Sequence, residues 1–270
     1  MCVADLTVHR FRGQDGVELA WRVVGSGRPV VLLHGLMGSG SLLAGQDLTL
    51  RLAAAGYQVI LPDLRGHGDS EGPRDPACYP PDVLTDDTLA LISHLGLDDY
   101  DLAGYSMGGK LVLRLLARGA RPAHAIVGGQ GLDALDAESE RTAGHRRVLA
   151  AVAGGAALPA GSAEAAMAQW IRQSGTDARA VGYVLDTFAA TPAAALRSVP
   201  TPTLVIAGDR DSRSASADAL AGLLPHGRLA LVPGDHMTAL DAPEFTTAVL
   251  QFLGRSGQES NGEATPPAVC

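Results

Sequence analysis

The chain has 270 residues, of which 46% are hydrophobic and 19% are charged. This length and composition fit one large globular domain with a small insertion, and they exclude a disordered chain. The formal net charge of −8 argues against nucleic acid and anionic membrane surfaces as partners.

The segment Met1–Arg10 lacks the basic start and apolar run of a signal peptide, and no stretch of the chain approaches the roughly 18 apolar residues of a membrane span. We therefore expect a cytoplasmic protein.

The three cysteines, Cys2, Cys78 and Cys270, lie far apart in the sequence. Their spacing predicts neither a disulfide framework nor a metal site, and no cofactor is expected.

The first half of the chain alternates predicted strands with predicted helices. Two strands at Thr7–Arg12 and Glu18–Val24 are joined by a turn-rich link. The further strands are predicted at Val30–Leu33, Tyr57–Leu61, Tyr100–Ala103 and His124–Val127. The helices are predicted at Leu42–Ala55, Asp82–Leu95 and Met107–Arg118.

The second half begins with an Ala-rich, helical block without strand signals, residues 132–198. This block is too long for an ordinary connection and predicts a helical lid. Strands and helices resume at Thr203–Ala207, Ala215–Leu224, Arg228–Val232 and Ala242–Leu253. The alternation predicts an α/β fold with a parallel sheet and helices on both faces. The expected organisation is a core of residues 1–131 and 199–254, the lid, and a disordered tail over 255–270.

The pentapeptide Gly104-Tyr-Ser106-Met-Gly108 lies between a predicted strand and a predicted helix. A serine on such a sharp turn raises its hydroxyl above the sheet, and the flanking glycines avoid collisions with neighbouring backbone. Ser106 is therefore the candidate nucleophile. The alternative is that Ser106 only caps the helix that begins at Met107, a role that needs none of these glycines.

A serine hydroxyl needs a base near neutral pH, and eight histidines compete for that role. His236 follows a predicted strand, at the end of the strand where catalytic groups of parallel sheets gather. It is the candidate base. Four other histidines are expected on helix or loop surfaces without a role, namely His94, His124, His145 and His226.

The base in turn needs a carboxylate that holds its tautomer and stabilises its charged form. The loop after the strand Thr203–Ala207 carries Asp209 and Asp211. Asp211 is preferred because it lies farther out on the loop, which leaves Asp209 as a turn residue. Asp235 and Asp241 are weaker candidates, and Asp235 points away from the site if the adjacent histidine points in.

Acyl transfer also needs backbone donors for the oxyanion of the tetrahedral intermediate. The Met107 N–H lies at a helix N-terminus, where the helix dipole supports negative charge. The glycine-rich loop His34-Gly35-Leu36-Met37-Gly38 brings the Leu36 N–H close as the second donor. Leu36 and Met107 are therefore the candidate oxyanion hole. The alternative for His34-Gly35 is a plain turn at the end of a strand.

Five segments, taken in this order, resemble the α/β-hydrolase superfamily. The segments are His34-Gly35, Asp63-x-Arg65-Gly66-His67-Gly68-Asp69-Ser70, Gly104-x-Ser106-x-Gly108-Gly109, Gly208-x-x-Asp211 and Gly234-x-His236. The chain is similar to the lidded esterase-like, haloperoxidase-like and meta-cleavage-product-hydrolase-like members. The resemblance, which runs from about residue 7 to residue 253, implies the α/β-hydrolase fold with a mostly parallel sheet and a small helical lid. It also implies that Ser106, Asp211 and His236 are nucleophile, acid and base, and that the Arg65–Ser70 loop is structural.

The apolar surroundings of Ser106 favour a small, neutral, fairly hydrophobic carboxylic ester as substrate, cleaved through an acyl-enzyme. The predicted substrate-binding residues are Gly35, Met37, Tyr105, Trp170 and Met237. Four further lid side chains face either the pocket or the core of the lid, namely Met167, Ile171, Tyr183 and Phe188.

Two other hypotheses stay open. The same three residues serve C–C bond hydrolysis, lactone hydrolysis or cofactor-free perhydrolysis, because the pocket rather than the triad selects the reaction. A non-catalytic, ligand-binding protein of the same fold is the third hypothesis, and the presence of all three residues disfavours it. The oligomeric state is open.

Overall fold

The computed structural model describes residues 6–254, so Cys2, Cys270 and the tail predicted for 255–270 lie outside the described residues. Its eight strands form one sheet in the order β1-β2-β4-β3-β5-β6-β7-β8. β1 and β2 pair antiparallel, as do β2 and β4, whereas every other neighbouring pair is parallel. The strands are β1 (His9–Arg12), β2 (Glu18–Gly25), β3 (Arg28–Leu33), β4 (Tyr57–Pro62), β5 (Asp101–Tyr105), β6 (Ala125–Gly128), β7 (Thr203–Gly208) and β8 (Gly227–Val232).

Helices cover both faces of the sheet, as the alternation of strands and helices predicts. The central strands are buried on both sides, so alternate residues contact opposite cores: Val30 and Leu32 join one hydrophobic cluster, and Val31 and Leu33 join the other. The first cluster is completed by α1 (Gly40–Ala44), α2 (Asp47–Ala54) and α10 (Pro243–Gly254). The second is completed by α3 (Val83–His94), α4 (Met107–Ala117) and α9 (Ala217–Leu223).

The prediction of a single helix at Leu42–Ala55 is wrong, because the structure has two helices there, α1 and α2. Gly45 ends α1, and Gln46 has an extended backbone with φ −77° and ψ 149°. Glycine is a poor helix former, and the break lets Leu43 and Leu48 pack against the same hydrophobic cluster. The apolar spacing runs through both helices, and so it concealed the break.

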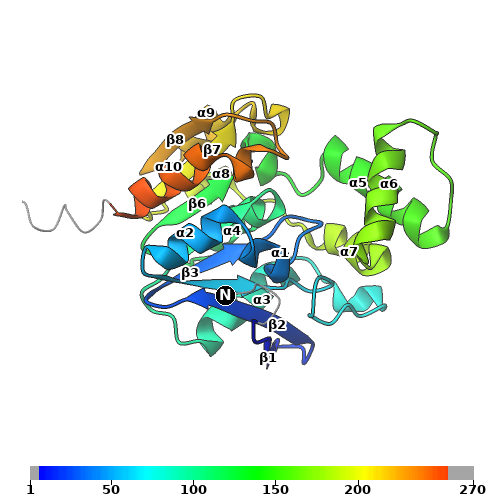
Figure 1. Ribbon diagram of the computed structural model, residues 1–270, viewed down its shortest axis with the longest axis horizontal. Helices are drawn as coiled ribbons and strands as arrows, with labels where there is room; N and C mark the ends of the chain where they lie inside the picture. The colour runs from blue at the N-terminus through cyan, green and yellow to red at the C-terminus, as the bar shows by residue number, and fades with distance from the viewer. Residues whose placement is uncertain (1–5, 255–270) are drawn as a thin grey trace, which may run out of the picture.

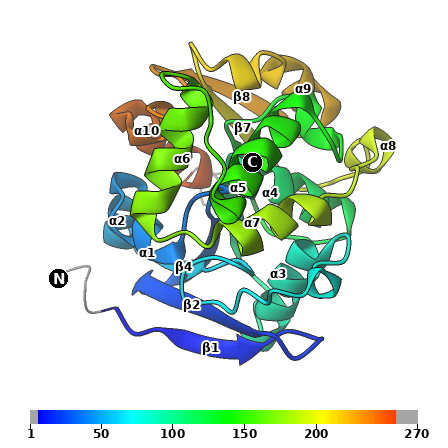
Figure 2. The same ribbon diagram turned by 90° about the vertical axis from the view of Figure 1, so that its right-hand side faces the viewer.

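Between β6 and β7 every regular element is helical. Three of these helices, α5 (Glu140–Gly154), α6 (Ala163–Ser174) and α7 (Ala178–Val184), project together from one side of the sheet (Figures 1 and 2). Side chains of Ser139, Ser162 and Asp177 accept hydrogen bonds from their first turns, which fixes where each begins. The shorter elements are η3 (Leu132–Leu135), η4 (Leu185–Thr187) and α8 (Ala193–Leu196). No helix in residues 6–254 has both the length and the hydropathy that a membrane crossing needs.

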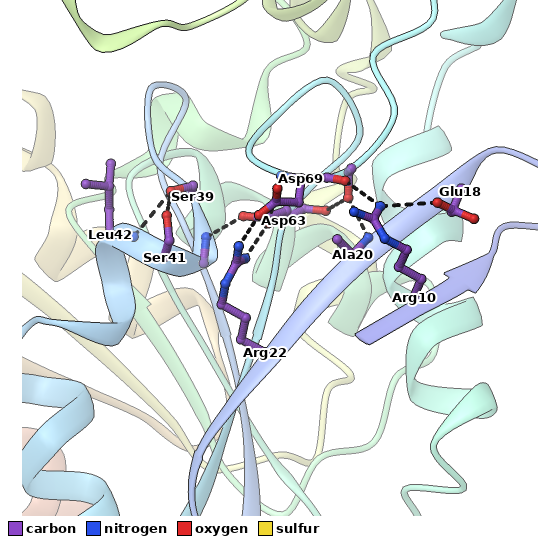
Figure 3. Close-up of polar contacts among 11 residues, drawn as sticks. Arg10, Glu18, Ala20, Arg22, Ser39, Ser41, Leu42, Asp63 and Asp69 are labelled. Carbon is purple, nitrogen blue, oxygen red and sulfur yellow. Dashed lines mark hydrogen bonds and ion pairs between the residues drawn. The ribbon is translucent and has the colours of Figure 1, made fainter. Parts of the chain in front are cut away.

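The carboxylate of Asp63, which follows β4, anchors the loop that joins β3 to α1. Its Oδ1 accepts a hydrogen bond from the Gly40 N–H (2.6 Å), and its Oδ2 accepts from Arg22 Nη1 (2.6 Å) and from the Asp69 N–H (3.0 Å) (Figure 3). A buried carboxylate is tolerated when it is paired and its lone pairs are used. The loop from residue 34 to residue 39 is thereby fixed at its far end.

Arg65 ties a second loop to the core. Its buried guanidinium donates to Asp87 Oδ2 (2.9 Å) and Oδ1 (2.8 Å), and to Asp15 Oδ2 (2.6 Å) and Oδ1 (3.0 Å). Two carboxylates thus satisfy a charge that would be costly if it were buried alone. All of these contacts are structural, and none of them reaches Ser106.

Candidate active site

Ser106 lies on the sharp turn between β5 and α4. Its backbone has φ 55° and ψ −120°, a positive φ that few residues other than glycine adopt. The turn needs glycine on both sides: a Cβ at Gly104 would lie 2.3 Å from the Gly108 carbonyl carbon, and one at Gly108 would lie 2.1 Å from Leu33 O. The strained residue is therefore held by close backbone contacts that larger residues would prevent.

A chain of hydrogen bonds links three side chains from three loops. Ser106 Oγ lies 2.9 Å from His236 Nε2, and His236 Nδ1 lies 2.8 Å from Asp211 Oδ2. A carboxylate only accepts, so Nδ1 carries the proton and Nε2 is free to accept from the serine hydroxyl. The Ser106 side chain makes no capping bond to α4. The alternative in which Ser106 is only a helix cap is therefore not what the structure shows.

The loop after β7 places Asp211, and not Asp209, beside the imidazole of His236. Asp211 Oδ1 accepts from the Arg213 N–H (2.8 Å), and its Oδ2 also accepts from Ser214 Oγ (2.7 Å), so the carboxylate is fixed while it faces His236. Asp209 Oδ1 instead accepts from the Gly234 N–H at 3.0 Å. β7 and β8 are parallel neighbours in the sheet, which brings the loops that follow them together.

The environment of His236 favours its neutral form. Burial and the positive charge of Arg213 lower the pKa of His236 below its ordinary value, and the Asp211 carboxylate opposes this shift only in part. The Tyr105 hydroxyl donates to the His236 carbonyl at 2.8 Å and so fixes the loop that carries the ring. An imidazole that is neutral near neutral pH is suited to accept a proton.

The N–H groups of Leu36 and Met107 have no protein acceptor in the part of the chain that the structure describes. Both residues lie with Ser106 around one cavity. The carbonyl of Gly35, in the same peptide group as the Leu36 N–H, accepts from His34 Nδ1 (2.7 Å) and from the Gly38 N–H (2.9 Å). Because a trans peptide points its N–H opposite to its carbonyl, these two bonds orient the Leu36 donor.

His34 helps to position this loop, a role that was not predicted from the sequence, although His34-Gly35 was named as a motif. Its Nε2 accepts from the Leu64 N–H at 3.1 Å, so its proton resides on Nδ1. Complete burial lowers the pKa of His34 to about 3, which keeps the ring neutral. The available signal was its place, directly after a buried strand and before the glycine-rich loop.

Two cavities meet at Ser106. The large pocket, about 550 Å³, contains His236 and all five residues predicted to bind substrate, together with Leu42, Met167 and Leu240. The residues predicted to bind substrate are Gly35, Met37, Tyr105, Trp170 and Met237. The small pocket, about 60 Å³, shares Leu36, Ser106, His145 and Arg213 with the large one and extends to Met107, Lys110 and Arg141.

The lid side chains divide between pocket and core. Met167 and Trp170 on α6 line the large pocket, and Phe188 lines the small one. Ile171 is fully buried in the core, and the Tyr183 ring contacts Tyr79 with centroids 5.4 Å apart. Both outcomes that the sequence left open thus occur within one lid.

Two histidines that were expected on the surface are not there. His124 is buried directly before β6, with Nδ1 2.8 Å from Asp101 Oδ1. His145 on α5 lines both pockets, and burial together with nearby Arg213 lowers its pKa to about 4. Tertiary docking of α5 turns this histidine toward Ser106, and local sequence does not encode that docking. His94 and His226 are exposed, as expected.

Residues 28–138 match the model of the alpha/beta hydrolase fold family. A non-heme haloperoxidase of Rhodococcus erythropolis is 30% identical over 269 residues, an alignment that covers 88% of this chain and 97% of that protein. The chain belongs to the α/β-hydrolase superfamily. An esterase of Thermogutta terrifontis has a similar structure, with a TM-score of 0.74 and 26% identity over 92% of this chain and 98% of that one.

The sequence similarity to some other relatives is local. The AB hydrolase superfamily protein YisY of Bacillus subtilis is 36% identical over 110 residues, which are 41% of this chain and 40% of that protein. The chain therefore matches well under two thirds of that relative's length. The shared fold, with its mostly parallel eight-stranded sheet and flanking helices, is the α/β-hydrolase fold predicted from the sequence.

Proposed function

We propose that this α/β-hydrolase cleaves carboxylic esters through an acyl-enzyme on Ser106. One observation carries the proposal: Ser106 Oγ lies 2.9 Å from His236 Nε2, beside two backbone N–H groups that have no acceptor within residues 6–254. This is the arrangement that acyl transfer requires, with a nucleophile on its base and donors beside the attacked carbonyl. Relatives named as esterases support the choice of an ester.

In the proposed first half-reaction His236 Nε2 takes the Ser106 proton while Oγ bonds to the carbonyl carbon. Negative charge develops on the carbonyl oxygen, and the Leu36 and Met107 N–H groups stabilise it. The bond from the carbonyl carbon to the alcohol oxygen then breaks, and His236 gives its proton to that oxygen. Water repeats the sequence, and the carboxylic acid leaves with Ser106 regenerated. Asp211 stabilises the charged imidazole throughout.

The large pocket suits the hydrophobic part of an ester. Its walls include Met37 and Leu42 from the loop after β3 and from α1, and Met167 and Trp170 from α6. We propose that residues 132–198 form a lid that shields this pocket from water, because Met167 and Trp170 of α6 form part of its wall. The proposal is tested by release of alcohol from esters of rising chain length, and hydrolysis of none of them by folded protein would overturn it.

A second candidate activity is perhydrolysis, which the relative named as a haloperoxidase favours. Hydrogen peroxide would replace water as the attacking group on the acyl-enzyme and release a peracid, with Ser106 again regenerated. The same residues serve both reactions, so the competition between the two nucleophiles decides the product. Peracid formation from an ester and hydrogen peroxide would distinguish this activity from plain hydrolysis.

The value of kcat/KM is expected to rise with pH and to reach its plateau at a lower pH than an ordinary histidine would give. Protonated His236 cannot accept the serine proton, so kcat/KM follows the deprotonated fraction of the free enzyme. Because burial and Arg213 lower the pKa of His236, the midpoint should lie below the ordinary value of about 6.5. The profile of kcat/KM from mildly acidic to mildly basic pH checks this.

Two variants sharpen the pH test. Arg213→Gln removes a positive charge that disfavours imidazolium, so the midpoint should move upward. Arg210→Gln, an exposed arginine of the same loop, should leave the midpoint where it was. A midpoint above 6.5 in the unaltered protein would contradict the lowered pKa of His236, and a flat profile would contradict His236 as the base.

A further inference from the structure

The small pocket is strongly cationic for a chain of this charge. Its wall carries Lys110, Arg141 and Arg213 against one acid, Asp133, although the whole chain has a formal net charge of −8. Lys110 is the only lysine in the sequence. Positive charge gathered in a cavity beside the nucleophile attracts an anionic ligand.

Of the three cationic side chains in the small pocket, that of Arg213 forms the fewest polar contacts. Within residues 6–254 its guanidinium has no hydrogen-bond or ion-pair partner, although the residue is partly buried. Burial lowers the pKa of Arg213, and nearby Arg141 adds to that effect. Arginine presents a planar fork of donors that matches a carboxylate, so an unpaired arginine in a cavity fits a carboxylate ligand.

The other two cations are already held in place. Arg141 Nη2 lies 3.2 Å from Asp133 Oδ2, and Lys110 Nζ donates to the Asp136 carbonyl with the Phe188 ring 5.0 Å away. These contacts fix both side chains at the cavity wall. The Asp133 carboxylate offsets the charge of Arg141, so Lys110 adds its charge to that of Arg213 without loss of side-chain freedom when an anion binds.

The two pockets correspond to the two halves of an ester. His236, which must protonate the departing alcohol, lines the large pocket and is absent from the wall of the small one. Of the two proposed oxyanion donors, Leu36 lines both pockets and Met107 lines only the small one. The alcohol half therefore lies in the large pocket beside His236, and the acyl half enters the small pocket.

We propose that the small pocket is a carboxylate-binding acyl subsite, so that the substrate is a half-ester of a short dicarboxylic acid with a hydrophobic alcohol. The pocket's volume of 60 Å³ holds about four to six water-sized groups, which is room for a two-carbon spacer and a carboxylate. The inference rests on the proposed function, and it replaces the neutral ester expected from the sequence with an anionic one.

The test compares benzyl hydrogen succinate with benzyl 4-methylpentanoate, whose isopropyl group replaces the free carboxylate at similar size. Benzyl alcohol release gives kcat/KM for each ester. The half-ester should be favoured by at least about tenfold, since hydrogen bonds to charged groups contribute about 10- to 100-fold in binding. Arg213→Gln should bring the ratio close to one, whereas Arg210→Gln, three residues earlier and exposed, should leave it unchanged. A ratio of one or less in the unaltered protein overturns the inference.

A binding measurement separates this inference from the proposed function. Calorimetry on Ser106→Ala measures the affinity for both esters without turnover, and the half-ester should bind at least about tenfold more tightly. Arg141→Gln serves as a second variant if Arg213→Gln does not fold, and it should weaken binding of the half-ester alone. Equal affinities for the two esters overturn the subsite even where both are hydrolysed. Preferential binding without any hydrolysis supports the subsite and overturns the proposed ester chemistry.

Discussion

Ser106→Ala is expected to lower kcat/KM by at least about 10⁴-fold for any ester that the protein hydrolyses, because loss of the nucleophile leaves only oxyanion stabilisation and binding. The variant removes only the Ser106 hydroxyl, which forms a hydrogen bond with His236, so the fold should persist. Alcohol release under first-order conditions measures the loss, and circular dichroism checks the fold.

Ser162→Ala is the matched control for this variant. Ser162 also precedes a helix, and its hydroxyl accepts from the Ala165 N–H at 3.1 Å, but it does not line either pocket. Losing this cap should cost about 1 kcal/mol of stability and little activity. Ester turnover by Ser106→Ala that matches turnover by Ser162→Ala would remove Ser106 from the nucleophile role.

Asp211→Asn is expected to lower kcat by about 10⁴-fold, the second-largest effect. The amide donates as well as accepts, so it favours the wrong tautomer of His236 and cannot stabilise the imidazolium. The geometry is kept because the side chain has the same shape, and its oxygen can still accept from the Arg213 N–H. Steady-state rates with one ester, together with a thermal unfolding curve, separate the chemical effect from a loss of stability.

Asp209→Asn supplies the comparison within the same loop. Asp209 accepts one backbone bond, from the Gly234 N–H, which an amide oxygen can also accept. Its effect on kcat should stay within a few-fold. If Asp209→Asn proves to be the more damaging of the two, the carboxylate that serves His236 lies two residues earlier than the structure places it.

The backbone positions of the site residues could be predicted from the sequence, because these residues lie in loops that directly follow predicted strands. Gly104 and Gly108 mark the turn at Ser106, and the loops after β7 and β8 must meet because the strands are parallel neighbours. The preference for Asp211 over Asp209 rested on loop position, and the hydrogen bond to His236 follows that choice. The catalytic roles of these residues stay a proposal that the variants test.

The cluster of cationic side chains around the small pocket could not be predicted from the sequence. Lys110, Arg141 and Arg213 lie on α4, α5 and the loop after β7, and no local pattern brings those three together. The surface position predicted for His145 was wrong for the same reason, because docking of α5 sets the direction in which its side chain points. Apolar periodicity finds the core face of a helix but not which polar residue meets a pocket.

Covalent labelling with a fluorophosphonate tests the central claim most directly, because the reagent reacts with a serine only when a base and an oxyanion pocket activate it. Mass spectrometry should find one adduct per chain, on the peptide that contains Ser106. His236→Ala should slow labelling sharply, whereas His226→Ala, an exposed histidine, should not. Folded protein without an adduct, or with an adduct on a different residue, would contradict acyl transfer through Ser106.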